Sequence, residues 1–411
     1  MSTLRVLHNP EVLSTSALTA EAQPRPVRAV VLVGFCAPML AFARRASSAG
    51  IRVHLIELVT GSGRFVRLSN ALEPDGIAMD WALVGTPQGL RVVRDFVQRV
   101  GAGAILSKDD YVLTWLGKCR AALEPACRVL APPPEVLEPL LDKCYQIDRA
   151  VEAGFELLPG WLLSSAEVIR TIPGYVYPVV IRPSRPFSAH PTFKAEVIGS
   201  RRALTALFES TRFTQPPVVQ QFCLGPNYVL HGVRSCAGRI LAIRLFKAYR
   251  KYRGFATSIV EEPLPPRLER AAVRFVEREN LTGAFHFDLL RAEADDSFYF
   301  LEVNCRLGGT TARVTQLGYD EPGLLLEAFH LVPPRPLSAL EPGTQATSIS
   351  LNLHQAIDEL RNRRDPLAYP RLPRLRSLLA ALREAMVVHD GLFNWQDLLF
   401  ALRYPRWRAR A

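Results

Sequence analysis

The apolar positions in the first third of the chain follow two alternating patterns. A continuous apolar run at 29–35 precedes a stretch with helical periodicity at 39–49 and a second apolar run at 53–57. This order predicts a β-loop-α-β unit with parallel strands and a right-handed crossover. A strand pattern at 104–110, followed by a helix at 111–123, predicts a further unit. The first loop holds a single glycine, so the three-glycine fingerprint of a dinucleotide site is absent.

Beyond the proline run at 132–134, which marks a linker, helical and strand patterns alternate irregularly. The predicted elements are a helix ending at 153, a strand at 177–183, a strand containing Lys194, a helix at 201–209, a strand at 218–222, antiparallel strands at 228–234 and 240–247, and a helix at 266–279. After 331 the sequence becomes rich in proline. A basic amphipathic helix is predicted near 374–387.

The segment 284–309 predicts a β-hairpin, because two apolar and aromatic runs flank a polar turn at 293–297. In the second strand, alternation places two sets of side chains on opposite faces: Leu301, Val303 and Cys305 on one, and Glu302, Asn304 and Arg306 on the other. A five-residue turn sets three pairs of residues opposite each other: Ala292 and Phe298, Asp288 and Glu302, and His286 and Asn304.

Two carboxylates directly across a ladder repel each other, and a divalent cation between them would remove that conflict. Oxygen ligands from Asp288, Glu302 and Asn304 suit Mg²⁺, which also takes substrate phosphates as ligands. The alternative interpretation is an edge hairpin with a solvated acidic face. Arg306 and the glycines Gly308 and Gly309 favour the ligand site, since glycine lets the backbone approach a ligand closely.

The composition indicates a globular protein with a large core, since the chain has 411 residues of which 48% are hydrophobic. The formal net charge of +11 allows nucleotides, nucleic acid or a membrane surface as partners. Basic residues cluster at 244–253 and at 403–411. The first cluster could bind nucleic acid, but its position among antiparallel strands favours a substrate site.

Cysteine usage and the absence of targeting patterns predict a cytoplasmic protein. The seven cysteines show no paired spacing, and Cys36, Cys223 and Cys305 lie in apolar runs, where reduced core thiols are expected. No signal-peptide pattern and no apolar run of the ~18 residues of a membrane span are present. We expect no membrane span.

Four elements then stand in one order: Asp142-Lys143 before a helix, a strand ending in Arg182, the strand VVQQF, and the hairpin closing with EVNCR. This order resembles the ATP-grasp superfamily over roughly residues 28–331, and most closely its carbamoyl-phosphate-synthase-like ligases. The resemblance implies a leader at 1–27, a Rossmann-like N-terminal α/β domain at 28–131, two α+β lobes of an ATP-grasp fold at 132–217 and 218–332, and a small helical tail at 333–411.

The resemblance also implies roles for individual residues. Lys143 and Arg182 would hold the ATP phosphates, with Lys194 as a further contact. The remaining expected nucleotide residues are Gln220, Gln221 and Phe222 at the adenine edge and Asn227, where relatives usually place a ribose-binding glutamate. The expected metal ligands are Asp288, Glu302 and Asn304, the catalytic cations are Arg306 and Arg182, and the substrate-carboxylate residues are Arg244, Lys247 and Arg250.

The function implied is an ATP-dependent ligase that joins a small carboxylate to an amine through an acyl phosphate, with ATP and Mg²⁺ (Mn²⁺ as an alternative). A homodimer is compatible with this expectation, and no nucleic acid is expected. Relatives usually have a glycine-rich flap over the phosphates, but the loop 184–194 has no glycine and two prolines. This loop and Asn227 leave a second hypothesis open, a non-catalytic regulator that binds a nucleotide or metabolite.

Overall fold

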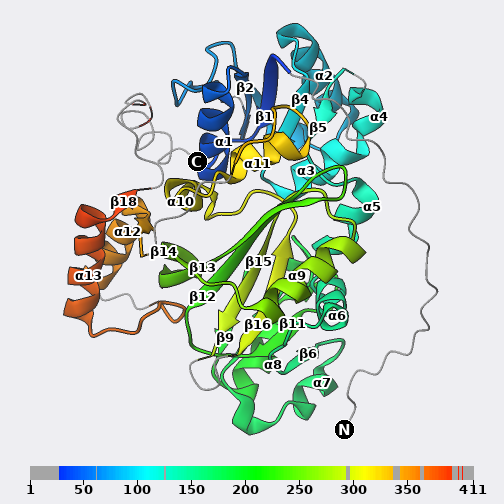
Figure 1. Cartoon of the computed structure of the whole chain (residues 1–411). Helices are drawn as coiled ribbons and strands as arrows, with labels where there is room; N and C mark the ends of the chain where they lie inside the picture. The colour runs from blue at the N-terminus through cyan, green and yellow to red at the C-terminus, as the bar shows by residue number, and fades with distance from the viewer. Residues whose placement is uncertain are drawn as a thin grey trace.

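The structure, a computed structural model, describes residues 27–61, 63–124, 126–292, 297–336, 343–361 and 365–390, together with residues 397 and 400. The predicted leader at 1–27 (apart from residue 27), most of the predicted turn 293–297 and the basic cluster at 403–411 lie outside these residues. Figure 1 shows a parallel sheet at the top, a large antiparallel sheet in the middle and a smaller lobe below. No described helix is long and apolar enough to cross a membrane.

The N-terminal region is a five-stranded parallel sheet in the order β3-β2-β1-β4-β5. Its strands are β1 (Ala29–Val33), β2 (Arg52–Val59), β3 (Ile77–Asp80), β4 (Ala104–Ser107) and β5 (Arg128–Val129), and its helices are α1 (Ala37–Ser48), α2 (Pro87–Val100), α3 (Asp110–Lys118) and α4 (Arg120–Leu123). All of β1 is buried, as expected of a continuous apolar run between layers of helices. The predicted β-loop-α-β units are confirmed.

The linker leads through α5 (Pro134–Leu137) to α6 (Lys143–Ala153). The Asp142 carboxylate caps α6 by accepting from the Cys144 amide at 2.9 Å, and Gly154 ends the helix in the left-handed conformation. The cap is important for the site because it places Lys143 at the first turn of α6.

A small lobe follows, with an antiparallel sheet in the order β6-β11-β7-β9 and its own apolar core. Its elements are β6 (Gly160–Leu162), α7 (Ala166–Thr171), β7 (Val179–Arg182), β8 (Ala189–His190), β9 (Glu196–Ile198), α8 (Arg201–Ser210), β10 (Arg212–Phe213) and β11 (Val218–Gln221). The prediction that Lys194 lies within a strand is wrong, because β9 begins two residues later. Lys194 instead belongs to a loop that crosses towards the large sheet.

The large sheet has seven strands in the order β16-β15-β12-β13-β14-β17-β18. Its main strands are β12 (Asn227–Arg234), β13 (Ile240–Tyr252), β14 (Phe255–Glu262), β15 (Gly283–Arg291) and β16 (Phe298–Asn304). Helix α9 (Pro266–Arg278) packs on one face, where Phe275 contacts Phe287 with ring centroids 5.3 Å apart. Alternation then directs His286 and Asp288 to the opposite face.

The hairpin register is confirmed at the predicted metal residues and wrong near the turn. His286 pairs with Asn304 and Asp288 with Glu302, but Arg291, not Ala292, pairs with Phe298. The difference is a β-bulge after Asp288, where the second strand contains one additional residue.

The bulge also changes the predicted faces. Phe300, not Leu301, lies in the core with Val303 and Cys305, while Leu301 lines the same cavity as Glu302. The prediction for Leu301 is therefore wrong, because the extra residue shifts the alternation by one position.

The C-terminal region is not only helical, in contrast to the predicted tail. Helices α10 (Thr311–Gln316) and α11 (Glu321–Ala328) lead to β17 (Gln345–Thr347), α12 (Ile349–Leu360), α13 (Arg374–Val387) and β18 (His389–Asp390). Strand β17 pairs antiparallel with β14 and extends the large sheet. Ser348, Leu351 and Leu367 line the central cavity, so this region completes a wall of the site.

Candidate nucleotide and metal site

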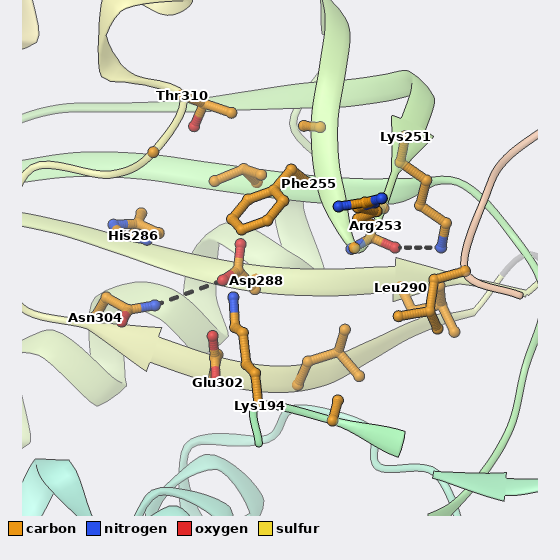
Figure 2. A pocket seen from close by; sticks show the side chains of 18 of the residues that line it. Lys194, Lys251, Arg253, Phe255, His286, Asp288, Leu290, Glu302, Asn304 and Thr310 are labelled. Carbon is orange, nitrogen blue, oxygen red and sulfur yellow. Dashed lines mark hydrogen bonds between the residues drawn. The ribbon is translucent and has the colours of Figure 1, made fainter. Parts of the chain in front are cut away.

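A central cavity of about 500 Å³ lies between the small lobe, the large sheet and the carboxyl ends of β1 and β4. Figure 2 shows Asp288 and Glu302 in the middle of this cavity, with Lys194 pointing towards them. Among the described residues that line it, eight carry a positive charge and two a negative charge: Lys108, Lys143, Arg182, Lys194, Lys251, Arg253, Arg306 and Arg313 against Asp288 and Glu302. This excess of cations favours an anionic ligand.

Lys143 and Arg182, predicted as phosphate-binding residues, meet at one end of the cavity. Lys143 comes from the first turn of α6 and Arg182 from the last residue of β7. Their nitrogens lie 3.7 and 3.9 Å from the Glu302 carboxylate. Arg182 also donates to the Leu301 carbonyl at 3.1 Å and to the Gln220 side-chain carbonyl. Burial lowers the pKa of both cations, although the Glu302 charge opposes that effect.

The predicted metal residues lie together on adjacent strands. Burial and the neighbouring Glu302 carboxylate raise the pKa of Asp288 to about 7. Glu302 is held at a pKa of about 2 because Lys143 and Arg182 outweigh the effect of its burial. Asn304 lies beside the pair, with its Nδ2 3.5 Å from an Asp288 oxygen.

These residues fit a magnesium ion. Repulsion between the two buried carboxylates favours the protonated form of Asp288, and a divalent cation would allow both to ionise. No cluster of three or more His, Cys, Asp or Glu side chains occurs in the part of the chain that the structure describes, so a dedicated all-protein cage is absent there. Two carboxylates and an amide match the preference of Mg²⁺, which takes its other ligands from water and phosphate.

Lys194 reaches the cavity from the loop before β9. Its Nζ lies 5.0 Å from the ring centroid of Phe255, at the turn between β13 and β14. Its charge lowers the pKa of Asp288, and Figure 2 shows the amine beside Asp288 and Glu302. A lysine in this position can neutralise phosphate charge without the glycine-rich backbone that the loop lacks.

Arg306 is held in place by the N-terminal region. Its Nε and Nη2 donate to the two Asp110 carboxylate oxygens at 2.6 and 2.8 Å, and Nη2 also donates to Asn304 Oδ1 at 3.1 Å. Asp109, the neighbour of Asp110, caps α3. No role for Asp110 was predicted. The sequence signal for one is the pair of acidic residues Asp109 and Asp110 shortly after a strand.

Gln220, Gln221, Phe222 and Asn227, which are predicted to bind the adenine and ribose, also line the cavity. The Phe222 amide already donates to the Pro178 carbonyl at 3.0 Å, so this amide is not available to a ligand. Lys251 was not predicted for the site, yet it lines the cavity and donates to Asn227 Oδ1 at 2.8 Å. Burial lowers the pKa of Lys251 to about 8.

The structure does not bring the three predicted substrate residues to the cavity wall. Arg244, Lys247 and Arg250 form ion pairs with Glu261, Glu262 and Glu384 at 3.3, 3.6 and 3.4 Å. Two register shifts between Ala248 and Lys251 change which side chains of β13 face the cavity. Consequently Lys251 and Arg253 line it instead.

His286, on the face of Asp288, also lines the cavity. Its Nδ1 lies 3.2 Å from the Arg306 carbonyl, which is an acceptor, so Nδ1 carries the proton in the neutral ring. Burial and the neighbouring His231 and Arg306 lower the pKa of His286 well below its usual value. His286 is therefore a neutral side chain of the cavity wall.

No protein-family model matches the sequence, and no curated protein matches it either. Solved structures do. The biotin carboxylase domain of 2-oxoglutarate carboxylase from Hydrogenobacter thermophilus, with MgADP, ADP and bicarbonate, has a TM-score of 0.60 and 15% identity over 78% of this chain and 74% of that one. The ADP complex of N5-carboxyaminoimidazole ribonucleotide synthetase has a TM-score of 0.62 and 10% identity over 87% and 97%.

A third similar structure is the L-amino acid ligase from Bacillus licheniformis, with a TM-score of 0.59 and 14% identity over 79% of each chain. All three are ATP-grasp enzymes, and the likeness confirms the ATP-grasp fold that the order of the motifs predicts. At these identities the likeness concerns the fold alone, so the chemistry has to be argued from the residues of this chain.

Proposed function

We propose that this chain, built on the ATP-grasp fold, is an ATP-dependent ligase that joins a carboxylate to an amine through an acyl phosphate, releasing ADP and phosphate. The observation that carries the proposal is that Lys143 and Arg182 face the Asp288–Glu302 pair in one cavity. Acidic metal ligands and phosphate-binding cations at contact distance are the groups that phosphoryl transfer needs.

The cavity offers a place for each part of the nucleotide. The adenine would lie against the end of β11, near Gln221 and Phe222, and the ribose near Asn227 and Lys251. The phosphates would then extend towards Lys143, Arg182 and Lys194, which all line the same cavity. A bound Mg²⁺ would be held by Asp288, Glu302 and Asn304, and it would neutralise charge on the phosphate oxygens.

The side chains of this protein would do the remaining work by orientation and electrostatics. A carboxylate that attacks the γ-phosphate must approach a highly negative group, and Arg306 and Arg182 lower that repulsion. Arg306 can do so from a fixed position because Asp110 binds it through two hydrogen bonds. Lys108, Arg253 and Arg313 provide further positive charge at the wall for the acid substrate.

The test is ADP release by purified protein with Mg²⁺, ATP and a matrix of acids and amines, followed by mass spectrometry of the product. We expect ADP release that requires both substrates and Mg²⁺. Glu302→Gln should abolish turnover while the thermal unfolding temperature stays within a few degrees. Release of AMP and pyrophosphate would replace the acyl phosphate by an acyl adenylate. ATP binding without turnover over the whole matrix would contradict the proposed activity.

A further inference from the structure

A buried polar cluster lies on the cavity face of the large sheet, next to the metal residues. His231 of β12 is fully buried and pairs with His286 across the β12–β15 ladder. Its Nδ1 lies 2.7 Å from Glu321 Oε1, and its Nε2 lies 2.7 Å from Thr310 Oγ1. Glu321, at the start of α11, is also fully buried. Thr310, His231 and Glu321 thus form a continuous hydrogen-bonded chain.

The directions of these hydrogen bonds follow from the acceptors. The Glu321 carboxylate already accepts the Thr311 hydroxyl proton on Oε2 at 2.6 Å, and an ionised carboxylate can only accept. His231 Nδ1 must therefore carry the proton that it shares with Oε1. In the neutral ring, Nε2 is then an acceptor, so the Thr310 hydroxyl donates its proton to His231.

The chain opens to the cavity at one end only. Thr310 lines the cavity, together with Gly309 and His286, whereas His231 and Glu321 do not. The His231 and His286 rings are stacked with centroids 5.5 Å apart, and Figure 2 places Thr310 and His286 at the same cavity as Asp288. The loop that contains Gly308 lies directly on the His231 and His286 rings, since a Cβ on Gly308 would be 3.0 Å from each ring. The glycine lets Thr310 reach His231.

The proposed reaction needs a proton acceptor at this place. An amine in water is mostly an ammonium ion, and it must lose a proton to attack an acyl phosphate. Asp288 and Glu302 are assigned to the metal, and the other charged residues of the wall are cations. In hydrolases an imidazole that is oriented by a carboxylate takes the proton of a neighbouring hydroxyl, and Thr310, His231 and Glu321 are arranged in that order.

We propose that Thr310, His231 and Glu321 form a relay that accepts the proton of the amine substrate, an inference that rests on the proposed ligase function. The ammonium substrate first gives one proton to Thr310 Oγ1, while the Thr310 proton passes to His231 Nε2. The free amine nitrogen then forms a bond to the acyl carbon, the carbon–oxygen bond to phosphate breaks, and phosphate leaves with the electron pair and takes up the second nitrogen proton. The imidazolium formed is stabilised by the Glu321 carboxylate, and its proton returns through Thr310 to phosphate or water.

The other groups around His231 do not compete for this role. The groups that face it, besides Glu321, are Tyr319, His286 and Arg244. Burial raises the pKa of Tyr319 well above its usual value, so it stays neutral, and Arg244 is paired with Glu261. Thr310 would contact the substrate, whereas His231 and Glu321 act through it as positioning residues.

Reaction rates with two different acceptor amines distinguish a proton relay from a cluster that has only a structural role. Hydroxylamine is largely unprotonated at neutral pH, so it can trap the acyl phosphate without a base, whereas an alkyl amine or amino acid needs one. Thr310→Val should lower kcat with the protonated amine by about 10²–10⁴-fold and retain most of the hydroxamate-forming rate. Thr310→Ser should restore the reaction with the amine.

Thr311→Val is the matched control, because this hydroxyl also binds Glu321 but does not line the cavity. It should leave the ratio of the two acceptors unchanged. Equal losses with both acceptors in Thr310→Val would overturn the relay. If the wild-type protein forms ADP with neither acceptor, the proposed function fails, and the relay must be judged without substrate.

The substrate-free measurement is the tautomer of His231, from nitrogen-15 NMR of histidine-labelled full-length protein. We expect the Nδ1–H tautomer, with a signal that changes in Thr310→Val. Glu321→Gln offers an amide donor to Nδ1 and should convert the ring to the Nε2–H tautomer, which cannot accept the Thr310 proton. An Nε2–H tautomer in the wild-type protein would overturn the inference whatever the activity.

Discussion

The ion pair between Asp110 and Arg306 connects the N-terminal sheet to the metal hairpin, and its removal is the sharpest test of the proposed site. Asp110 begins α3, directly after the carboxyl end of β4, and both of its carboxylate oxygens accept from the Arg306 guanidinium, at 2.6 and 2.8 Å. The Asp110 charge raises the pKa of Arg306 against the opposing effect of burial. Asp110→Asn keeps the shape of the side chain and removes its charge.

The magnitude follows from the partial burial of the pair. The Arg306 and Asp110 side chains are 14% and 31% exposed. Removing one partner of a fully buried pair costs about 3–5 kcal/mol, while exposed pairs contribute about 0.2–1 kcal/mol. We therefore expect Asp110→Asn to lower the free energy of unfolding by about 1–3 kcal/mol. A guanidinium that is no longer fixed should also lower kcat by about 10- to 100-fold, since each tenfold corresponds to about 1.4 kcal/mol.

The assay combines urea unfolding with steady-state ADP release, and we expect the loss in kcat, with little change in the KM for ATP. Asp109→Asn is the control, because asparagine also caps helices well and the Asp109 carboxylate accepts from the Tyr111 and Val112 amides of α3. Full kcat and unchanged stability in Asp110→Asn would refute the claim that the N-terminal region positions Arg306.

Three further outcomes are expected. Below pH 7 a metal must displace the proton on Asp288, so Mn²⁺ affinity measured by electron paramagnetic resonance should rise about tenfold per pH unit up to about 7 and then level off. Asp288→Asn should remove this dependence, and a flat wild-type profile would contradict the raised pKa of Asp288. Lys251→Met should raise the KM for ATP by about tenfold through loss of a charged hydrogen bond near the ribose, and an unchanged KM would exclude Lys251 from the nucleotide site. Arg244→Ala should leave the KM values for the acid and the amine within about twofold of the wild-type values, because Arg244 is paired with Glu261. A large increase in either KM would show that Arg244 contributes to substrate binding.

The hairpin shows which features the local sequence pattern can predict and which it cannot. Alternation and turn length were sufficient to pair Asp288 with Glu302 and His286 with Asn304, because side chains alternate with a period of two in any regular strand. The same reasoning failed for Phe298 and Leu301. A bulge inserts one residue, and nothing in the local pattern of apolar residues marks its position.

The predicted placement of the basic cluster at 244–253 differs from the structure for a related reason. The sequence predicts that Arg244, Lys247 and Arg250 bind a substrate, but register shifts bring Lys251 and Arg253 to the cavity wall and leave the three predicted residues in ion pairs. The acidic partners Glu261, Glu262 and Glu384 lie on other elements, so their proximity depends on strand pairing and helix packing.

Local sequence patterns were sufficient for the parallel N-terminal units, the order of the ATP-grasp elements, and the residue types and local register of the metal hairpin. These features depend on periodicity and on neighbours within about 20 residues along the chain. Only the tertiary structure decided that Asp110 orients Arg306 and that His231 connects Thr310 to Glu321. Those contacts join residues 196, 79 and 90 positions apart, and their energies depend on burial and exact distance, which no local pattern specifies.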